Sequence, residues 1–171
     1  MKPLFAVIAL ALFLPLSVKG AEVKVGQSAP AFTVKTLAGK TFRLKDARGK
    51  VVLLDFWGVA CPPCKIQMPA LQRWHEQYAG RGMVVVGIEA MGTETKAIRK
   101  ALKERGVTYP VASDTGNRLM TLYGVTAHPT TILIDQEGKI VHIEVGYVRG
   151  DEKEIEKRLL PLLTRSKESR P

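Results

Sequence analysis

The chain has 171 residues, with 26 Lys or Arg against 16 Asp or Glu, so its formal net charge at pH 7 is +10. This length suits one domain that can bury a core without disulfide staples. The positive charge comes without interleaved aromatic residues or a nucleic-acid-binding motif, so we expect no nucleic-acid partner. A basic balance alone supports only weak attraction to acidic partners or an anionic membrane.

The N-terminal 20 residues have the pattern of a secretory signal peptide. Lys2 gives a positive start, residues 4–16 are almost wholly apolar, and small residues lead to a cut after Gly20. The apolar run contains Pro15 and is shorter than the roughly 20 residues of a membrane-spanning helix, although an uncleaved N-terminal anchor is the alternative. In both cases residues 21–171 are exported, and we expect a bacterial periplasmic location.

The next segments predict alternating strands and helices. Residues 32–34 and 41–44 flank a turn and form a hairpin. Val51–Trp57 is apolar without alternation, which fits a strand covered on both faces, and Pro62–Tyr78 has helical periodicity. The remaining elements, in chain order, are a strand at 83–88, helices at 93–105 and 117–123, a strand at 131–134, a turn at 135–138, a strand at 139–145 and a helix at 151–163.

This order predicts an α/β domain with a mixed central sheet flanked by helices and extended by an N-terminal β-hairpin. We expect its core to span about residues 29–163. Residues 164–171 form a basic C-terminal tail. Much of the excess charge falls there and in the last helix, at Lys157, Arg158, Arg165, Lys167 and Arg170.

The only two cysteines, Cys61 and Cys64, are three residues apart. A disulfide between them closes so short a loop that it stabilises the fold by only about 2 kcal/mol, so a redox role explains the pair better than a structural one. Cys61 falls near the N-cap of the predicted helix, where free N–H groups and the helix dipole favour a thiolate. We therefore expect Cys61 to be the nucleophile.

Pro62 and Pro63 limit this activation. Neither has an N–H group, so the Cys64 N–H is the nearest donor to the Cys61 sulfur. We expect a moderately acidic thiol, which favours a reductant, because a strongly oxidising pair needs a very acidic thiolate.

These residues resemble the thioredoxin superfamily, and more narrowly its exported TlpA/ResA-type thiol-disulfide oxidoreductases, from about residue 29 to 163. The resemblance rests on Val51–Trp57 before the CPPC motif, on Lys65 and Pro69 after it, and on the segment VTAHPTT at 125–131, which looks like the family's cis-proline loop. It implies a thioredoxin fold and dithiol exchange with client proteins.

The resemblance also implies roles for other residues. Pro129 is expected to be cis, to lie against the dithiol and to help dock the substrate backbone. His128 would lie beside the sulfurs, where its charge could stabilise a thiolate near neutral pH, the alternative being a local hydrogen bond. Asp55 would lie beneath the dithiol with a raised pKa and exchange a proton with Cys64, unless it is a paired structural acid. Trp57 is expected to be core and floor of the active site.

Two departures from the family pattern stand near the motif. Many TlpA/ResA-type proteins carry Asn at the place of Asp55, and the superfamily often has an aromatic residue at the place of Ala60. Glu89 or Glu94 could correspond to an acidic residue that some ResA-type relatives use near their active site. For both we favour a surface or helix-capping role.

The sequence therefore predicts an enzyme that reduces disulfides of client proteins, for example apocytochrome c, and is recharged by a membrane electron donor of the DsbD/CcdA kind. We expect a monomer without a resident metal and without a cofactor other than the redox-active disulfide. One alternative is a dithiol oxidase of secreted proteins. Another is a copper-delivery protein that uses Cys61, Cys64 and His128, although a closed tetrahedral metal site requires a fourth ligand.

Overall fold

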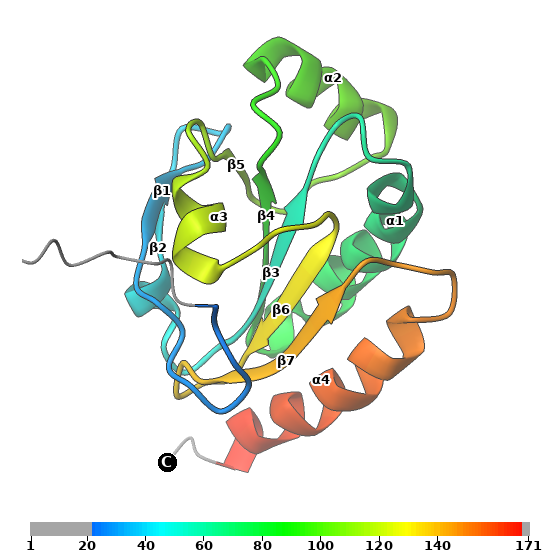
Figure 1. Ribbon diagram of the computed structural model, residues 1–171. Coiled ribbons are helices and arrows are strands. Elements are labelled where there is room, and N and C mark those ends of the chain that lie inside the picture. The colour runs from blue at the N-terminus through cyan, green and yellow to red at the C-terminus, as the bar shows by residue number, and fades with distance from the viewer. Residues whose placement is uncertain (1–21, 169–171) are drawn as a thin grey trace, which may run out of the picture.

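The computed structural model describes residues 22–168, so the predicted signal peptide lies outside the described residues. The described chain forms a five-stranded sheet in the order β5-β4-β3-β6-β7 and a separate two-stranded sheet, β1-β2. Figure 1 shows the larger sheet in the middle of the molecule with helices on both sides. Among the described helices, none is long and apolar enough to cross a membrane.

The central strand is β3 (Val51–Trp57), and all seven of its residues are buried. It pairs in parallel with β4 (Met83–Glu89), which pairs in parallel with β5 (Val111–Ser113). On its other side β3 pairs antiparallel with β6 (Thr130–Ile134), which continues into β7 (Ile140–Val145). The apolar run without alternation is explained by this position, because both faces of β3 are covered.

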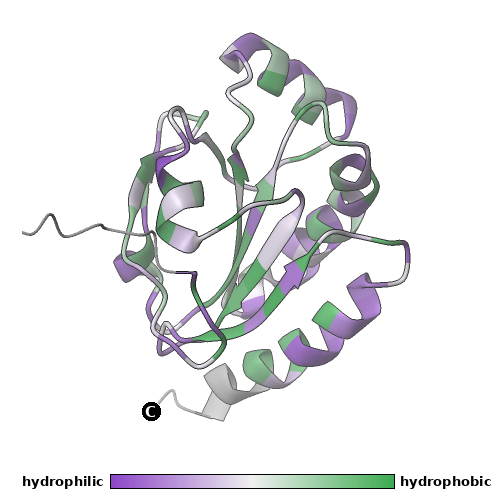
Figure 2. Ribbon diagram, viewed as in Figure 1, coloured by the Kyte–Doolittle hydropathy of each residue, from purple (hydrophilic) through white to green (hydrophobic). Residues whose placement is uncertain are grey.

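Four α-helices cover the sheet: α1 (Pro62–Tyr78), α2 (Thr95–Glu104), α3 (Arg118–Tyr123) and α4 (Glu152–Glu168). Apolar residues of α1, α2 and α4 pack on one face, together with Leu53 and Trp57 of β3. Residues of α3 and the hairpin pack on the other face, with Leu54 and Phe56. In Figure 2 hydrophobic and hydrophilic residues alternate around α4, as expected for a helix with one face on the core.

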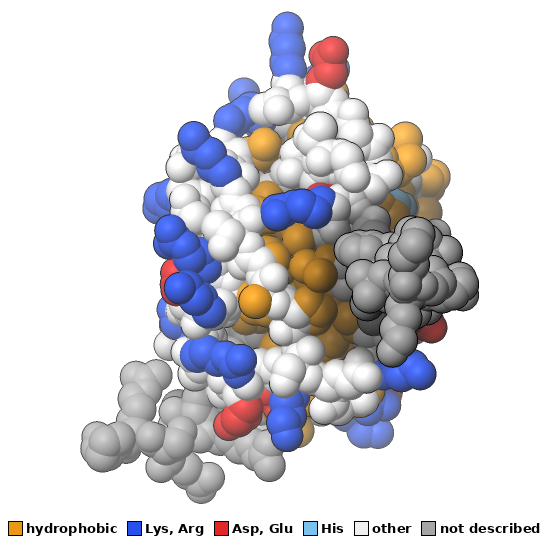
Figure 3. Space-filling view, turned by 60° about the vertical axis from the view of Figure 1, so that its left-hand side comes forward, with side chains coloured by type: hydrophobic (Ala, Val, Ile, Leu, Met, Phe, Trp, Pro, Cys, Tyr) orange, Lys and Arg blue, Asp and Glu red, His pale blue; other side chains and the backbone are white. Residues whose placement is uncertain are grey.

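The predicted hairpin is present as β1 (Thr33–Lys35) and β2 (Thr41–Arg43), followed by a 3-10 helix, η1 (Leu44–Ala47). A bridge between Thr36 and Ala112 ties the hairpin to the edge strand β5. The hairpin therefore covers an edge that would otherwise be open to pairing. Figure 3 turns the hairpin side of the molecule toward the viewer and shows Lys and Arg side chains along the left edge of that face.

The mixed sheet, the flanking helices and the hairpin confirm the predicted fold. The bounds of β3 and α1 agree with the sequence prediction to the residue. The other predicted elements differ by one residue at one or both ends, apart from two larger differences: α2 begins at Thr95 rather than at 93, and α4 continues to Glu168 rather than to 163. The strand β5 was not predicted, because three residues are too few to show a periodicity.

Candidate active site

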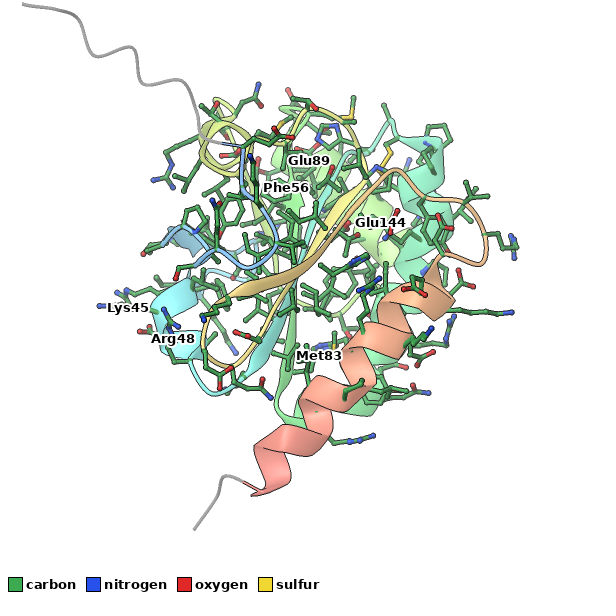
Figure 4. All side chains as sticks on the ribbon, turned by 60° about the horizontal axis from the view of Figure 1, so that its bottom comes forward. Lys45, Arg48, Phe56, Met83, Glu89 and Glu144 are labelled. Carbon is green, nitrogen blue, oxygen red and sulfur yellow. A yellow bond between two sulfur atoms is a disulfide. The ribbon has the colours of Figure 1, made fainter. Side chains whose placement is uncertain are left out.

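Three chain segments meet at one end of the sheet. The strand β3 ends at Trp57 and leads through Gly58 to Cys61, and the parallel β4 ends beside it, where the Ala90 N–H donates to the Trp57 carbonyl at 3.0 Å. The antiparallel β6 begins at this end, because Thr130 pairs with Phe56. Figure 4 labels Met83 and Glu89 at the two ends of β4. Topology thus brings the CPPC motif, the end of β4 and the His128–Pro129 segment to one edge.

The dithiol forms a disulfide between Cys61 and Cys64, with 5.4 Å between their Cα atoms. Cys61 is the N-cap of α1, as predicted, and its Sγ accepts a hydrogen bond from the Cys64 N–H at 3.3 Å. Pro62 and Pro63 occupy the first two helical positions, where no N–H is available. The sulfur of Cys61 therefore has one local backbone donor, and α1 remains continuous past Pro69.

Asp55 is fully buried on the same face of β3 as Leu53 and Trp57, because side chains two apart on a strand share a face. This face belongs to the cluster that contains both cysteines. Burial raises the pKa of Asp55 to about 7, since removal from water penalises the charged form. The Oδ1 atom has no hydrogen-bond partner among the described residues, so the structure does not place Asp55 in a paired structural role.

The surroundings of Asp55 come from four other segments: β4, the loop before β5, β6 and α1. Of the residues concerned, the sequence prediction had named only Thr131, as part of the cis-proline loop. Gly87 lies beside it on β4 and leaves room for the ring of Tyr109. Burial raises the pKa of the Tyr109 hydroxyl well above its usual range, and the nearby Asp55 carboxylate raises it further. On the other side Thr131 of β6 accepts a hydrogen bond from Gln67 of α1 at 2.8 Å. The sequence offered one signal for this polar surrounding of Asp55, namely the polar residue Gln67 on the buried face of the predicted helix.

The His128–Pro129 peptide bond is cis, as the family resemblance implied. Burial lowers the pKa of His128, and the negative charge of Glu89 opposes this in part. Burial of the ring therefore works against the imidazolium charge that would stabilise a thiolate, and Glu89 works in its favour. The Nε2 atom is buried without a hydrogen-bond partner among the described residues.

Glu89 is completely buried, so the predicted surface role is wrong for this residue. Its carboxylate accepts hydrogen bonds from the Thr93 N–H at 3.2 Å and from the Thr93 hydroxyl at 2.6 Å, which fixes the loop before α2. It also lies near enough to His128 to raise the pKa of that ring. Glu94 is the exposed N-cap of α2 and makes no side-chain cap hydrogen bond.

Apolar side chains are exposed near the disulfide. Met91 is half exposed, and its Sδ lies over Gly58, where a Cβ atom would be only 2.0 Å away. Ile66 of α1 and Val148 of the loop after β7 are exposed as well. Gly146 of this loop donates its N–H to the Pro129 carbonyl at 2.7 Å. Met91 thus adds exposed apolar surface beside the segment that leads from Gly58 to Cys61.

The part of the chain that the structure describes has no group of three or more His, Cys, Asp or Glu side chains placed to hold a metal ion. Cys61, Cys64 and His128 thus do not form such a group in the disulfide-bonded protein. The geometry instead allows the exchange of a dithiol for a disulfide at the exposed end of α1.

This chemistry, on a sheet of this order, defines the class of thioredoxin-fold thiol-disulfide oxidoreductases. The chain belongs to the AhpC/TSA family, whose family model matches residues 25–143.

Individual relatives agree with the family. The chain is 37% identical to the thiol-disulfide oxidoreductase ResA of Bacillus thuringiensis (strain Al Hakam) over 125 residues, which is 73% of this chain and 72% of the relative. It is 35% identical to the thioredoxin-like protein YneN of Bacillus subtilis (strain 168) over 149 residues, 86% of each chain. A solved structure from Chlorobium tepidum, assigned as the thiol:disulfide interchange protein DsbE, has 32% identity and a TM-score of 0.78 over 83% of this chain and 99% of its own. The protein is a thiol-disulfide oxidoreductase.

Proposed function

We propose that this oxidoreductase works outside the cytoplasm as a reductase of client proteins. The observation that carries the proposal is the single local backbone donor at the Cys61 sulfur. With Pro62 and Pro63 at the first two helical positions, the thiolate receives less stabilisation than at an N-terminus with free N–H groups. A less stabilised thiolate makes the reduced form the better electron donor.

The reaction starts from the reduced dithiol. The Cys61 thiolate attacks one sulfur of the client disulfide, the client S–S bond breaks, and the departing client thiolate takes a proton. Cys64 then loses its proton and attacks the Cys61 sulfur of the mixed disulfide. The Cys61–Cys64 bond forms as the bond between Cys61 and the client sulfur breaks, and the departing client thiolate takes a second proton. The client leaves as a dithiol, and two electrons have passed to it.

Asp55 is the proposed acceptor of the Cys64 proton. Its pKa of about 7 lies near the operating pH, where a carboxyl can both take and return a proton. Asp55 lies on the face of β3 that packs against the cluster containing both cysteines, and this position supports the role. Trp57 is buried in the same cluster and forms part of the floor, while His128 and Pro129, just before β6, border the site.

We further propose the setting of this reaction from the family resemblance. A signal peptide at residues 1–20 directs the chain to the periplasm, and a membrane electron donor of the DsbD/CcdA kind returns two electrons to the disulfide. Apocytochrome c is the proposed client, and the protein acts as a monomer without a further cofactor. The ResA and DsbE names of its relatives support this setting.

The test is the reduction potential of the Cys61–Cys64 pair, measured in defined thiol-disulfide buffers. We expect a value near or below about −230 mV, whereas a value near about −120 mV would make the protein an oxidant. Expression of the full chain in a bacterium tests export, with an N-terminus at Ala21 as the expected result. A protein that keeps Met1 and stays in the cytoplasmic fraction would contradict the periplasmic setting.

A further inference from the structure

A pocket of about 280 Å³ opens beside the dithiol helix, between α1 and the loop that joins β7 to α4. Figure 1 shows this loop reaching from the end of β7 toward α1. Apolar residues of α1, Ile66 and Pro69, form part of the lining. Three cations line it as well: Lys65 and Arg73 from α1 and Arg149 from the loop. None of the roles proposed above uses this pocket.

The pocket continues directly from the nucleophile. Cys61, Lys65, Pro69 and Arg73 are spaced four residues apart, so they follow one side of α1. At a rise of 1.5 Å per residue, Lys65 is about 6 Å and Arg73 about 18 Å from Cys61 along the helix axis. A polypeptide bound at Cys61 and directed along this side of α1 would therefore pass both cations.

The opposite wall is held in place by hydrogen bonds. The Gly146 N–H donates to the Pro129 carbonyl at 2.7 Å, which fixes the start of the loop to the cis-proline segment. Further along, the Tyr147 hydroxyl donates to Glu152 at 2.6 Å, and the Val148 N–H donates to Asp151 at 2.7 Å. The wall is thus formed before a partner arrives, which reduces the entropy lost on binding.

The charge of the pocket is positive and largely unpaired. The side chains of Lys65, Arg73 and Arg149 make no hydrogen bond and no ion pair to other described residues. The single acid of the lining, Glu152, is engaged by the Tyr147 hydroxyl and by a backbone N–H. These hydrogen bonds lower the pKa of Glu152, and the charge of Arg73 adds to the effect. At neutral pH three cations face one anion that already has partners.

We propose that this pocket binds an acidic segment of the client protein next to the cysteine that Cys61 attacks. An extended chain advances about 3.3 Å per residue, so Asp or Glu two to five residues from the client cysteine would reach Lys65, Arg149 and Arg73. The apolar side chains of Ile66 and Pro69 would contact the stems of the client residues. The proposal rests on the proposed function, because it assigns a substrate class to the same dithiol.

The experiment compares two disulfide-bonded peptides that differ only at the third and fourth residues after the reactive cysteine, Glu-Glu in one and Gln-Gln in the other. The readout is the ratio of their rate constants for reduction by the reduced protein at low ionic strength. We expect a ratio of about ten for the unchanged protein, since its two additional carboxylates can form two surface ion pairs that together correspond to about that factor. In R73Q/R149Q the ratio should fall to about three or less.

A matched control removes the same charge elsewhere. Lys35 and Lys50 are exposed, Lys35 on the hairpin and Lys50 just before β3, and neither lines the pocket. The K35Q/K50Q variant should keep the ratio near ten. A ratio near one in the unchanged protein would overturn the proposal. An equal loss in both double variants would overturn it as well, because it would assign the preference to overall charge.

A second measurement separates the pocket from the redox function. A labelled acidic peptide with Ser in place of Cys is titrated with the oxidised protein, and binding is followed by fluorescence anisotropy. We expect binding that weakens in 0.5 M salt and in R73Q/R149Q. If the protein binds this peptide in that way but reduces neither substrate, the pocket stands and the proposed reductase function fails. Equal binding to R73Q/R149Q and to the unchanged protein would overturn the pocket.

Discussion

Replacing Asp55 by Asn should make the oxidised protein more stable at neutral and alkaline pH, by an amount that depends on pH. Burial raises the pKa of Asp55 from an ordinary value of 3.8 to about 7. The folded protein therefore keeps a proton that the unfolded chain releases between about pH 4 and pH 7. The stability linked to this proton is fully present below about pH 4 and is lost as the pH rises to about 7. Asn has nearly the same shape and never acquires the charge.

The magnitude follows from the two pKa values. Since one pKa unit corresponds to 1.36 kcal/mol, the free energy of unfolding of D55N relative to the unchanged protein should rise by about 2 kcal/mol near pH 5.5 and by about 4 kcal/mol above pH 7. For an m value of about 2 kcal/mol/M, the urea midpoint at pH 8 should increase by about 2 M. This gain applies at a site that we assign to catalysis, where stability and function are expected to oppose each other.

Urea unfolding of both oxidised proteins at pH 4.5, 5.5 and 8 measures this difference. The matched control is D46N, because Asp46 is exposed and pairs with Arg43 on the surface at 3.5 Å. Its effect should stay within about 0.5 kcal/mol at each pH. A difference between D55N and the unchanged protein that is the same at pH 4.5 and pH 8 would refute the reasoning, since it would mean that Asp55 titrates alike in the folded and unfolded states.

Three further predictions concern the site. Replacing Cys64 by Ser should trap a mixed disulfide between protein and client, seen as a stable adduct by mass spectrometry; failure to accumulate it would argue against Cys64 as the resolving thiol. Pro63→Ala supplies an N–H at the second helical position, where the sulfur of the N-cap residue Cys61 can accept a hydrogen bond from it, and should raise the reduction potential by about 15 to 30 mV. Pro62→Ala supplies its N–H at the first position and should change the potential less. Equal shifts in the two variants would contradict the geometry. Glu89→Gln should lower the pKa of His128 further in an NMR titration, because the charge that raises it is removed, and an unchanged pKa would show that the two groups do not interact.

The local parts of this protein could be predicted from the sequence because their causes are local. An unbroken apolar run defines β3, the prolines and the helical periodicity define the start and length of α1, and a spacing of three residues lets Cys61 and Cys64 pair. The N-cap position of Cys61 also follows from neighbours along the chain, whereas the raised pKa of Asp55 depends on burial by segments that are distant in sequence.

Other features could not be read from local pattern. The strand β5 exists because Val111–Ser113 pairs with the end of β4, a contact between residues more than 20 positions apart. Glu89 was expected at the surface or as a helix cap, but it is completely buried, and its carboxylate binds Thr93 of the loop that leads to α2. Tyr109, in the loop before β5, lies near Asp55 because Gly87, the β4 partner of Asp55, has no side chain where the tyrosine ring packs.

The sequence by itself determined the fold class, the reactive pair and the element from which each predicted site residue comes. Only the tertiary structure decided what surrounds that pair: a His128 ring whose pKa is lowered by burial, a buried Glu89, and a cationic pocket in which Arg149 faces Lys65 and Arg73 of α1. The physical reason is one of range. Periodicity and capping act within a few residues along the chain, whereas burial and electrostatic fields depend on segments that meet only after the sheet has formed.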